Sequence, residues 1–139
     1  MGIASKIDLT EEQNLLVKTI REITEEKFKP KSGELTESGE FPFENIKILG
    51  ELGVLGISIP EEYGGSDGTV MDAVLILEEI AKGCYITAMA VLGEIGVQSK
   101  AIVAYGTEEQ KQKYLPRIAK GEAIMAICIT EPDVGSDAA

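Results

Sequence analysis

Five stretches of this sequence place apolar residues three or four positions apart, and this spacing constrains the fold more than any other feature. Residues three or four apart share one face of an α-helix, whereas a half-buried strand places apolar residues at every second position. The pattern therefore predicts an all-α fold whose helices bury their apolar faces against one another. The five predicted helices span residues 9–28, 41–53, 70–83, 86–106 and 106–122.

Side chains that can pair with free backbone groups support the predicted helix starts. Thr10 with Gln13 and Thr107 with Gln110 both follow the capping-box pattern, in which each side chain accepts a hydrogen bond from the backbone N–H of the other residue. Pro42 suits the start of the second helix, because a backbone N–H would have no helical partner there. The helix starts are therefore predicted from local chemistry as well as from periodicity.

Two stretches between the predicted helices lack helical spacing. Residues 29–40 are polar and are predicted to be a linker, whereas residues 54–69 contain Pro60 and several glycines and are predicted to be a loop. The pair Gly64 and Gly65 resembles part of a phosphate-binding loop but lacks the Lys-Ser/Thr of that motif. Plain turn chemistry explains this pair better.

The fourth predicted helix, residues 86–106, is apolar on nearly all sides, which predicts that other helices surround it. It contains the small residues Ala88, Ala90, Gly93 and Gly96. Small residues allow a neighbouring helix to approach closely, and they can also leave room for a ligand. The sequence leaves both interpretations open, with close packing the commoner reason.

The pattern changes after the fifth helix. Residues 123–130 have no helical spacing, and their β-branched residues, such as Ile127, Ile129 and Thr130, favour a strand. A single strand is not stable without partners. We therefore expect the chain to be the N-terminal portion of a longer protein. The predicted division is a helical domain at residues 1–121, followed at residues 122–139 by the first strand and turn of a truncated β domain.

Composition excludes several classes of function. The formal net charge of −11 disfavours binding to nucleic acid or to an anionic membrane surface. The chain has no histidine, which removes His-based catalytic triads and His-ligated zinc, and no metal site is expected. Cys84 and Cys128 both lie among apolar residues and are predicted to be reduced core residues. No secretory signal or transmembrane span is expected, which favours the cytoplasm, or the mitochondrial matrix for a processed eukaryotic protein.

Two segments resemble the acyl-CoA dehydrogenase family. The sequence "YGTEEQKQKYLPRIAKGE" at residues 105–122 is close to a segment typical of that family, and "AICITEPDVGSDAA" at residues 126–139 resembles its first signature. The order of five helices followed by a strand also agrees. One departure is visible, since Asp133 and Val134 stand where the family often has Gly-Ala. This difference is expected to alter the local turn geometry without abolishing the site.

The resemblance implies the N-terminal five-helix bundle of an FAD-dependent enzyme of fatty acid metabolism that oxidises acyl-CoA thioesters to 2,3-enoyl-CoA. It also implies an electron-transfer flavoprotein as partner and a homo-oligomer when the protein is full length. The family's catalytic base is a carboxylate in a later helical domain, so no catalytic residue is expected in this chain and the chain alone is expected to be inactive. Glu131 and Asp137 are instead assigned to a turn or to salt bridges.

The chemistry of the last segment suits a flavin. Apolar side chains can form a wall for the ring, glycine allows close approach of the backbone, and the hydroxyls of Thr130 and Ser136 can form hydrogen bonds. The resemblance implies that residues 127–136 contact the flavin and that Ser136 also lies against the CoA thioester. The implied cofactor-binding residues are Ile127, Cys128, Ile129, Thr130, Gly135 and Ser136.

The fourth helix is the best candidate for a wall of the acyl pocket, because similar proteins pass the acyl chain between this bundle and the flavin. The implied substrate-binding residues there are Met89, Ala90, Gly93 and Val97, with Gly93 expected to leave depth. Three alternatives remain open: a plain polar turn at residues 130–137, a non-catalytic helical interaction module, and a related flavoprotein that acts on another substrate.

Overall fold

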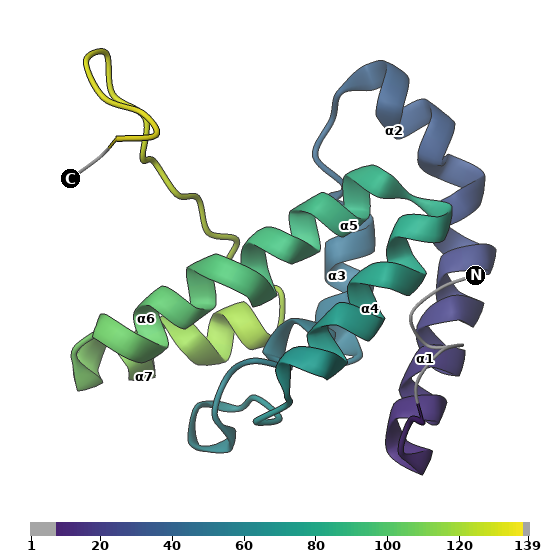
Figure 1. Ribbon diagram of the computed structural model, residues 1–139, viewed down its shortest axis with the longest axis horizontal. Helices are drawn as coiled ribbons and strands as arrows, with labels where there is room; N and C mark the ends of the chain where they lie inside the picture. Colours follow the sequence, from purple (N-terminus) through teal and green to yellow (C-terminus); the bar gives the residue numbers. More distant parts are fainter. Residues whose placement is uncertain (1–7, 138–139) are drawn as a thin grey trace.

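The computed structural model describes residues 8–137, and most of them are helical (Figure 1). The first helix continues through a π-helical turn (Thr24–Phe28) and a 3₁₀ turn (Lys29–Lys31) into α2, and a second π-helical turn (Gly93–Gln98) joins α5 to α6. The helices are α1 (Glu11–Ile23), α2 (Ser32–Ser38), α3 (Phe43–Glu51), α4 (Val70–Gly83), α5 (Tyr85–Leu92), α6 (Ser99–Tyr105) and α7 (Glu108–Ala119).

All five predicted helices are present, and the predicted all-α class is confirmed. The fourth predicted helix corresponds to α5, the second π-helical turn and α6, which run on from one another. One helix was not predicted, because α2 lies inside the stretch expected to be a linker. Its sequence "SGELTES" has little helix propensity. The partly buried Leu35 packs against the core, and Gly39 ends the helix in the left-handed conformation with φ of 68°.

Capping boxes start three of the helices. Both predicted boxes are present, at the starts of α1 and α7. A third, unpredicted box pairs Thr69 with Asp72 at the start of α4. The amide Nε2 of Gln13, itself in the first box, donates a hydrogen bond of 2.9 Å to Oδ1 of Asp72. The starts of α1 and α4 are therefore tied together by side chains that also cap them.

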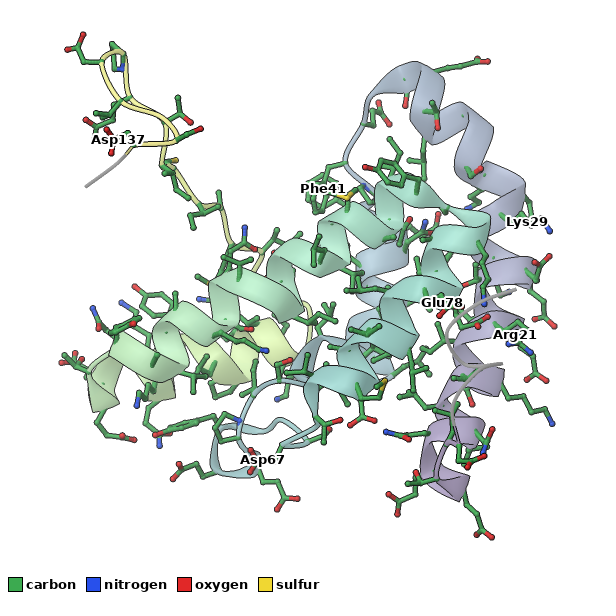
Figure 2. All side chains as sticks on the ribbon, in the orientation of Figure 1. Arg21, Lys29, Phe41, Asp67, Glu78 and Asp137 are labelled. Atoms are coloured by element: carbon green, nitrogen blue, oxygen red, sulfur yellow. The ribbon has the colours of Figure 1, made fainter. Side chains whose placement is uncertain are left out.

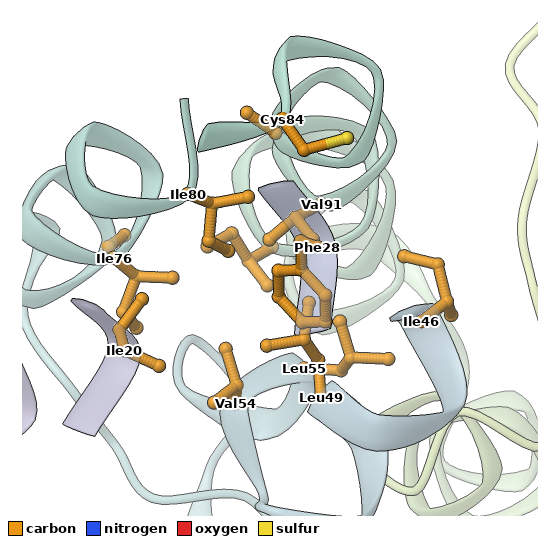
Figure 3. Packing of buried hydrophobic residues seen from close by; sticks show 13 residues of the cluster. Ile20, Phe28, Ile46, Leu49, Val54, Leu55, Ile76, Ile80, Cys84 and Val91 are labelled. Atoms are coloured by element: carbon orange, nitrogen blue, oxygen red, sulfur yellow. The ribbon is translucent and has the colours of Figure 1, made fainter. Parts of the chain in front are cut away.

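The main core lies between α1, α3, α4 and α5 (Figure 3). Phe28 is fully buried in it, and most of the surrounding side chains are aliphatic. This agrees with a composition of only 5% aromatic residues. The buried members of this cluster are Ile20, Phe28, Ile46, Leu49, Val54, Leu55, Ala73, Ile76, Ile80, Cys84, Ala88, Val91 and Ile95.

A buried ion pair joins α1 to α4. Glu79 on α4 is only 1% exposed, and Arg21 on α1 donates hydrogen bonds of 2.9 and 3.1 Å to its two oxygens. Lys82 donates a further hydrogen bond to the same carboxylate. Burial alone would raise the pKa of Glu79, but the hydrogen bonds from Arg21 and Lys82 outweigh burial and hold the pKa below its ordinary value.

A second, smaller core surrounds α7. Its buried residues are Ile59, Tyr63, Leu115, Ile118 and Ala119, and the partly buried Ala123 and Met125 pack against them. Ile59 and Tyr63 come from the stretch predicted to be a loop, which contains two 3₁₀ turns (Val54–Gly56 and Glu61–Tyr63). This small core attaches the beginning of the C-terminal segment to the bundle.

The predicted strand at residues 123–130 is not formed. In residues 123–137 the backbone has no regular secondary structure, and the segment runs away from the helices (Figure 1). A strand requires a neighbouring strand to pair its N–H and C=O groups, and none of the described residues provides one. The β propensity of these residues is therefore not sufficient to form a strand in this chain.

The helical run Tyr85–Tyr105 is long and apolar enough to cross a membrane, by length and composition only, and no such span was expected from the sequence. Buried core helices of other proteins meet the same criterion. In this fold 33% of its most apolar stretch is buried inside the bundle, where it contributes Ala88, Val91 and Ile95 to the main core.

Candidate functional site

The C-terminal segment ends in a tight turn, Glu131–Val134, and the predicted flavin-binding residues lie on either side of it. The backbone N–H of Glu131 donates to the carbonyl of Val134 at 2.8 Å, and the N–H of Val134 donates back to Glu131 at 3.3 Å. A Cβ added to Gly135 would lie 3.8 Å from Cγ2 of Thr130, so these two residues are neighbours across the turn. The Asp-Val pair that departs from the family pattern lies inside this turn.

The predicted cofactor-binding side chains are open to solvent. The Thr130 and Ser136 side chains are exposed, and neither hydroxyl has a hydrogen-bond partner among residues 8–137. Ile127 and Ile129 are 50% and 55% exposed. Cys128 is exposed and free, so its prediction as a core residue is wrong, whereas Cys84 is buried as predicted. The segment thus presents both hydroxyl groups and apolar side chains to a ligand.

The predicted acyl-binding residues lie on the long helix. Met89 and Val97 are 47% and 48% exposed, and Ala90 and Gly93 are half-buried. Two further apolar side chains, Tyr85 and Leu92, are exposed nearby on α5. We use the name apolar face of α5 for the exposed side chains of Tyr85, Met89 and Leu92 on α5 together with Val97 in the π-helical turn that follows it.

The space beside Gly93 is occupied by another side chain of this protein. A Cβ added to Gly93 would lie 3.1 Å from Oε1 of Gln98 and 3.4 Å from its Nε2. Both residues belong to the π-helical turn that joins α5 to α6. The glycine therefore accommodates the Gln98 amide, and the depth expected there from the sequence is filled in this structure.

The predicted cofactor-binding residues of the C-terminal segment and the predicted acyl-binding residues of the long helix do not lie together in this chain. The C-terminal segment runs away from the helical bundle, with Asp137 near its far end, while the apolar face of α5 stays on the bundle (Figure 2). A site that uses both groups needs the segment to be held by further protein structure. The assignment of the segment to another domain stays a prediction.

Glu94, a buried acid that was not singled out from the sequence, connects the long helix to the C-terminal segment. Glu94 in the π-helical turn is 2% exposed, and its Oε1 accepts a hydrogen bond of 3.0 Å from the backbone N–H of Met125. Burial raises the pKa of Glu94, and the Met125 hydrogen bond only partly opposes this. An acidic residue within a nearly all-apolar helix is the signal by which it could have been found.

Residues 10–122, almost the whole helical part, match the family described as the N-terminal domain of acyl-CoA dehydrogenase. The chain belongs to the acyl-CoA dehydrogenase family.

Individual relatives of this acyl-CoA dehydrogenase domain support the same family assignment. The short-chain-specific acyl-CoA dehydrogenase of Clostridium acetobutylicum is 42% identical over 94% of this chain and 34% of that protein. A chain in the structure of the electron transferring flavoprotein of Acidaminococcus fermentans has a TM-score of 0.88 and 35% identity, over 99% of this chain and 35% of that chain. The acyl-CoA dehydrogenase of Bacillus anthracis, solved with FAD, has a TM-score of 0.86 and 38% identity, over 94% of this chain and 22% of that chain.

The chain spans about a third of the length of the curated acyl-CoA dehydrogenase relatives that it matches. The match to the family's N-terminal domain ends at residue 122, just before the segment with the exposed hydroxyls. Glu131 and Asp137 in that segment are exposed, and neither side chain pairs with another described residue. They are not brought together with the apolar face of α5, so they do not form an acid–base pair at that surface.

Proposed function

We propose that this chain is the N-terminal part of an FAD-dependent acyl-CoA dehydrogenase that oxidises acyl-CoA thioesters to 2,3-enoyl-CoA. The match to the family's N-terminal domain over residues 10–122 carries this proposal. The 42% identity to a short-chain-specific acyl-CoA dehydrogenase supports an acyl-CoA substrate. The chemistry removes a proton from Cα and a hydride from Cβ of the acyl group.

The residues of the C-terminal segment fit a flavin. Its exposed hydroxyls, Thr130 and Ser136, have no partner among the described residues, so both are free to bond polar edges of a ligand. Ile127 and Ile129 offer exposed apolar surface for a planar ring. The related Bacillus anthracis enzyme was solved with FAD, which supports the same cofactor here. When bound, the cofactor supplies the acceptor for the hydride.

The apolar face of α5 is the proposed wall for the acyl chain. Met89 and Val97 offer exposed apolar surface there, whereas the Gln98 amide fills the space beside Gly93. Ser136 would then lie between the flavin and the thioester. In this arrangement the helical domain binds and orients the substrate and excludes water from it.

The remaining parts of the reaction belong to the rest of the protein. We assign the catalytic base to a carboxylate beyond this chain, since Glu131 and Asp137 are exposed residues of a turn segment. An electron-transfer flavoprotein is the proposed electron acceptor, and the close match to a chain in such a structure supports it. Assembly as a homo-oligomer and a location in the cytoplasm, or in the mitochondrial matrix for a processed eukaryotic protein, complete the proposal.

Turnover assays on two lengths of the protein test this function. The 139-residue chain should fold but show no turnover with acyl-CoA and an artificial electron acceptor. The full-length protein should bind flavin, and its flavin absorbance should bleach when acyl-CoA is added. A full-length protein that folds without flavin would refute the proposal and favour a helical interaction module. Bound flavin that no acyl-CoA reduces would instead favour a flavoprotein acting on another substrate.

A further inference from the structure

Glu94 differs from the other fully buried acid of the described chain. Glu79 is equally inaccessible but is held by Arg21 and Lys82. Glu94 has no cation within ion-pair distance among residues 8–137, and the chain places it in the π-helical turn between α5 and α6. A buried carboxyl without a counter-ion is costly, so the contacts that it does make require an explanation.

The contacts of Glu94 point to the C-terminal segment. Oε1 accepts the hydrogen bond from the backbone N–H of Met125, 31 positions further along the chain. The backbone carbonyl of Glu94 accepts a 2.6 Å hydrogen bond from Oγ of the buried Ser99, which fixes the turn. Oε2 of Glu94 and Oε1 of Gln98 are both buried without a partner among the described residues. The Glu94 side chain therefore uses one oxygen to hold the segment, and its other oxygen has no partner among the described residues.

Met125 is the last point at which the bundle holds the segment by a hydrogen bond. The N–H groups of Glu122 and Ala123 donate to the carbonyl of Arg117 at the end of α7. Between Met125 and the Glu131–Val134 turn, no described residue forms a further backbone or side-chain hydrogen bond. The predicted flavin-binding residues begin two positions after Met125. Whatever fixes Met125 therefore fixes where that segment starts.

We propose that Glu94 is a positioning residue that fastens Met125 and thereby sets the starting point of the flavin-contacting segment, residues 127–136. The flavin part of this inference rests on the proposed function, whereas the fastening of Met125 does not. Glu94 acts through the backbone of the segment and touches neither cofactor nor substrate. Carboxyl oxygens are strong acceptors for a backbone N–H, and a buried site excludes competing water.

Amide hydrogen exchange on the 139-residue chain tests the fastening. We compare wild type with Glu94→Ala, which removes the acceptor, and with Glu94→Gln, which keeps an amide oxygen in the same place. Ser99→Ala is the matched control, because it alters the same buried turn but leaves the carboxyl. The amides of Glu122 and Ala123 serve as internal references, since Arg117 holds them independently.

In Glu94→Ala the Met125 amide should exchange about five to ten times faster, which is the range expected for loss of one net hydrogen bond. Glu94→Gln and Ser99→Ala should leave Met125 within about twofold of wild type by the same reasoning. The reference amides should be unchanged in all variants. Equal exchange of Met125 in wild type and Glu94→Ala would overturn the fastening. Loss of protection in Ser99→Ala as large as in Glu94→Ala would also overturn it, because damage to the helix would then explain both.

Flavin affinity in the full-length protein tests the positioning. Glu94→Ala should raise the flavin dissociation constant by about five- to tenfold, while Glu94→Gln restores it to near the wild-type value. An unchanged dissociation constant in Glu94→Ala would overturn the positioning role and leave the proposed function intact. A wild-type protein that binds no flavin would overturn the proposed function and the flavin part of this inference together. The exchange rate of the Met125 amide tests whether Glu94 holds Met125, whether or not the protein binds flavin.

Discussion

Replacing Arg21 with methionine should destabilise the helical domain measurably at neutral pH. The change removes two hydrogen bonds, of 2.9 and 3.1 Å, to a carboxylate that is 1% exposed. Complete loss of a partner from a buried pair costs about 3–5 kcal/mol. Lys82 still bonds Glu79 in the variant, and Arg21 is itself half exposed, so we expect a loss of about 2 kcal/mol, within the range for a hydrogen bond to a charged group.

Urea unfolding of the 139-residue chain, followed by far-ultraviolet circular dichroism, measures this loss. Lys18→Met is the matched control, since Lys18 lies on the same helix and carries the same charge. Its nearest acid, Glu22, is 3.9 Å away, and both side chains are exposed. That substitution should change the free energy of unfolding by less than about 0.5 kcal/mol. The comparison separates the buried contact from the general effect of removing a positive charge.

The difference between wild type and Arg21→Met should also depend on pH. The folded-state pKa of Glu79 is lowered by its hydrogen bonds, so the pair stabilises the fold fully above the unfolded-state pKa, near 4.3. This contribution is lost as pH falls through the lower, folded-state pKa. The gap in unfolding free energy should thus be largest at pH 7 and shrink toward pH 3. A variant as stable as wild type at pH 7, or a gap that stays constant in acid, would refute the reasoning.

Three further predictions concern packing, burial and the candidate site. Gly50→Ala should lower the free energy of unfolding by about 1–3 kcal/mol, because the added Cβ would overlap the backbone carbonyl of Lys120 just after α7. Gly33→Ala meets no atom within 4 Å and should stabilise α2 by about 0.5 kcal/mol; thermal unfolding compares the two variants, and equal effects would contradict the packing. Glu94→Gln should raise the free energy of unfolding by about 1 kcal/mol at pH 8, since ionising a buried acid with a raised pKa costs stability. The gain should shrink as pH falls through the raised, folded-state pKa and vanish below the unfolded-state pKa, and urea midpoints at pH 8 and below the unfolded-state pKa check it. Thr130→Ala and Ser136→Ala should each weaken flavin binding or slow flavin reduction in the full-length protein, by about 0.5–1.5 kcal/mol. Neither should change the stability of the 139-residue chain, since both hydroxyls are exposed and have no partner among residues 8–137; full flavin content and unchanged reduction rates would contradict the assignment.

The helices could be predicted from the sequence because their signals are local. A capping box such as Thr10 with Gln13 needs only residues three apart, and the structure forms it as expected. The short helix α2 could not be predicted, because its stability depends on Leu35 reaching the core and on Gly39 adopting a left-handed conformation. Tertiary packing therefore stabilises α2 although its helix propensity is weak.

In the C-terminal segment, by contrast, strong local propensity predicted a strand that does not form. Ile127 and Ile129 have strong β propensity, but a strand depends on hydrogen bonds to a neighbour, which the described chain does not supply. The exposure of Cys128 has the same origin, because apolar neighbours in sequence bury a side chain only when the segment is packed. Glu94 was missed because a helical pattern shows which residues share a face and gives no information on a backbone N–H that arrives from a distant segment.

The hydrogen bond from Gln13 to Asp72 has a consequence for how the domain opens. Each of these two side chains closes a capping box at its own helix start, and together they connect the first turns of α1 and α4. Fraying of one start withdraws a partner from the other, so the two ends form one cooperative unit for local unfolding. Their amides should open with a shared free energy, although 59 positions separate the linked residues. The domain then frays at this edge as a pair of coupled helix ends, in contrast to two termini that melt independently.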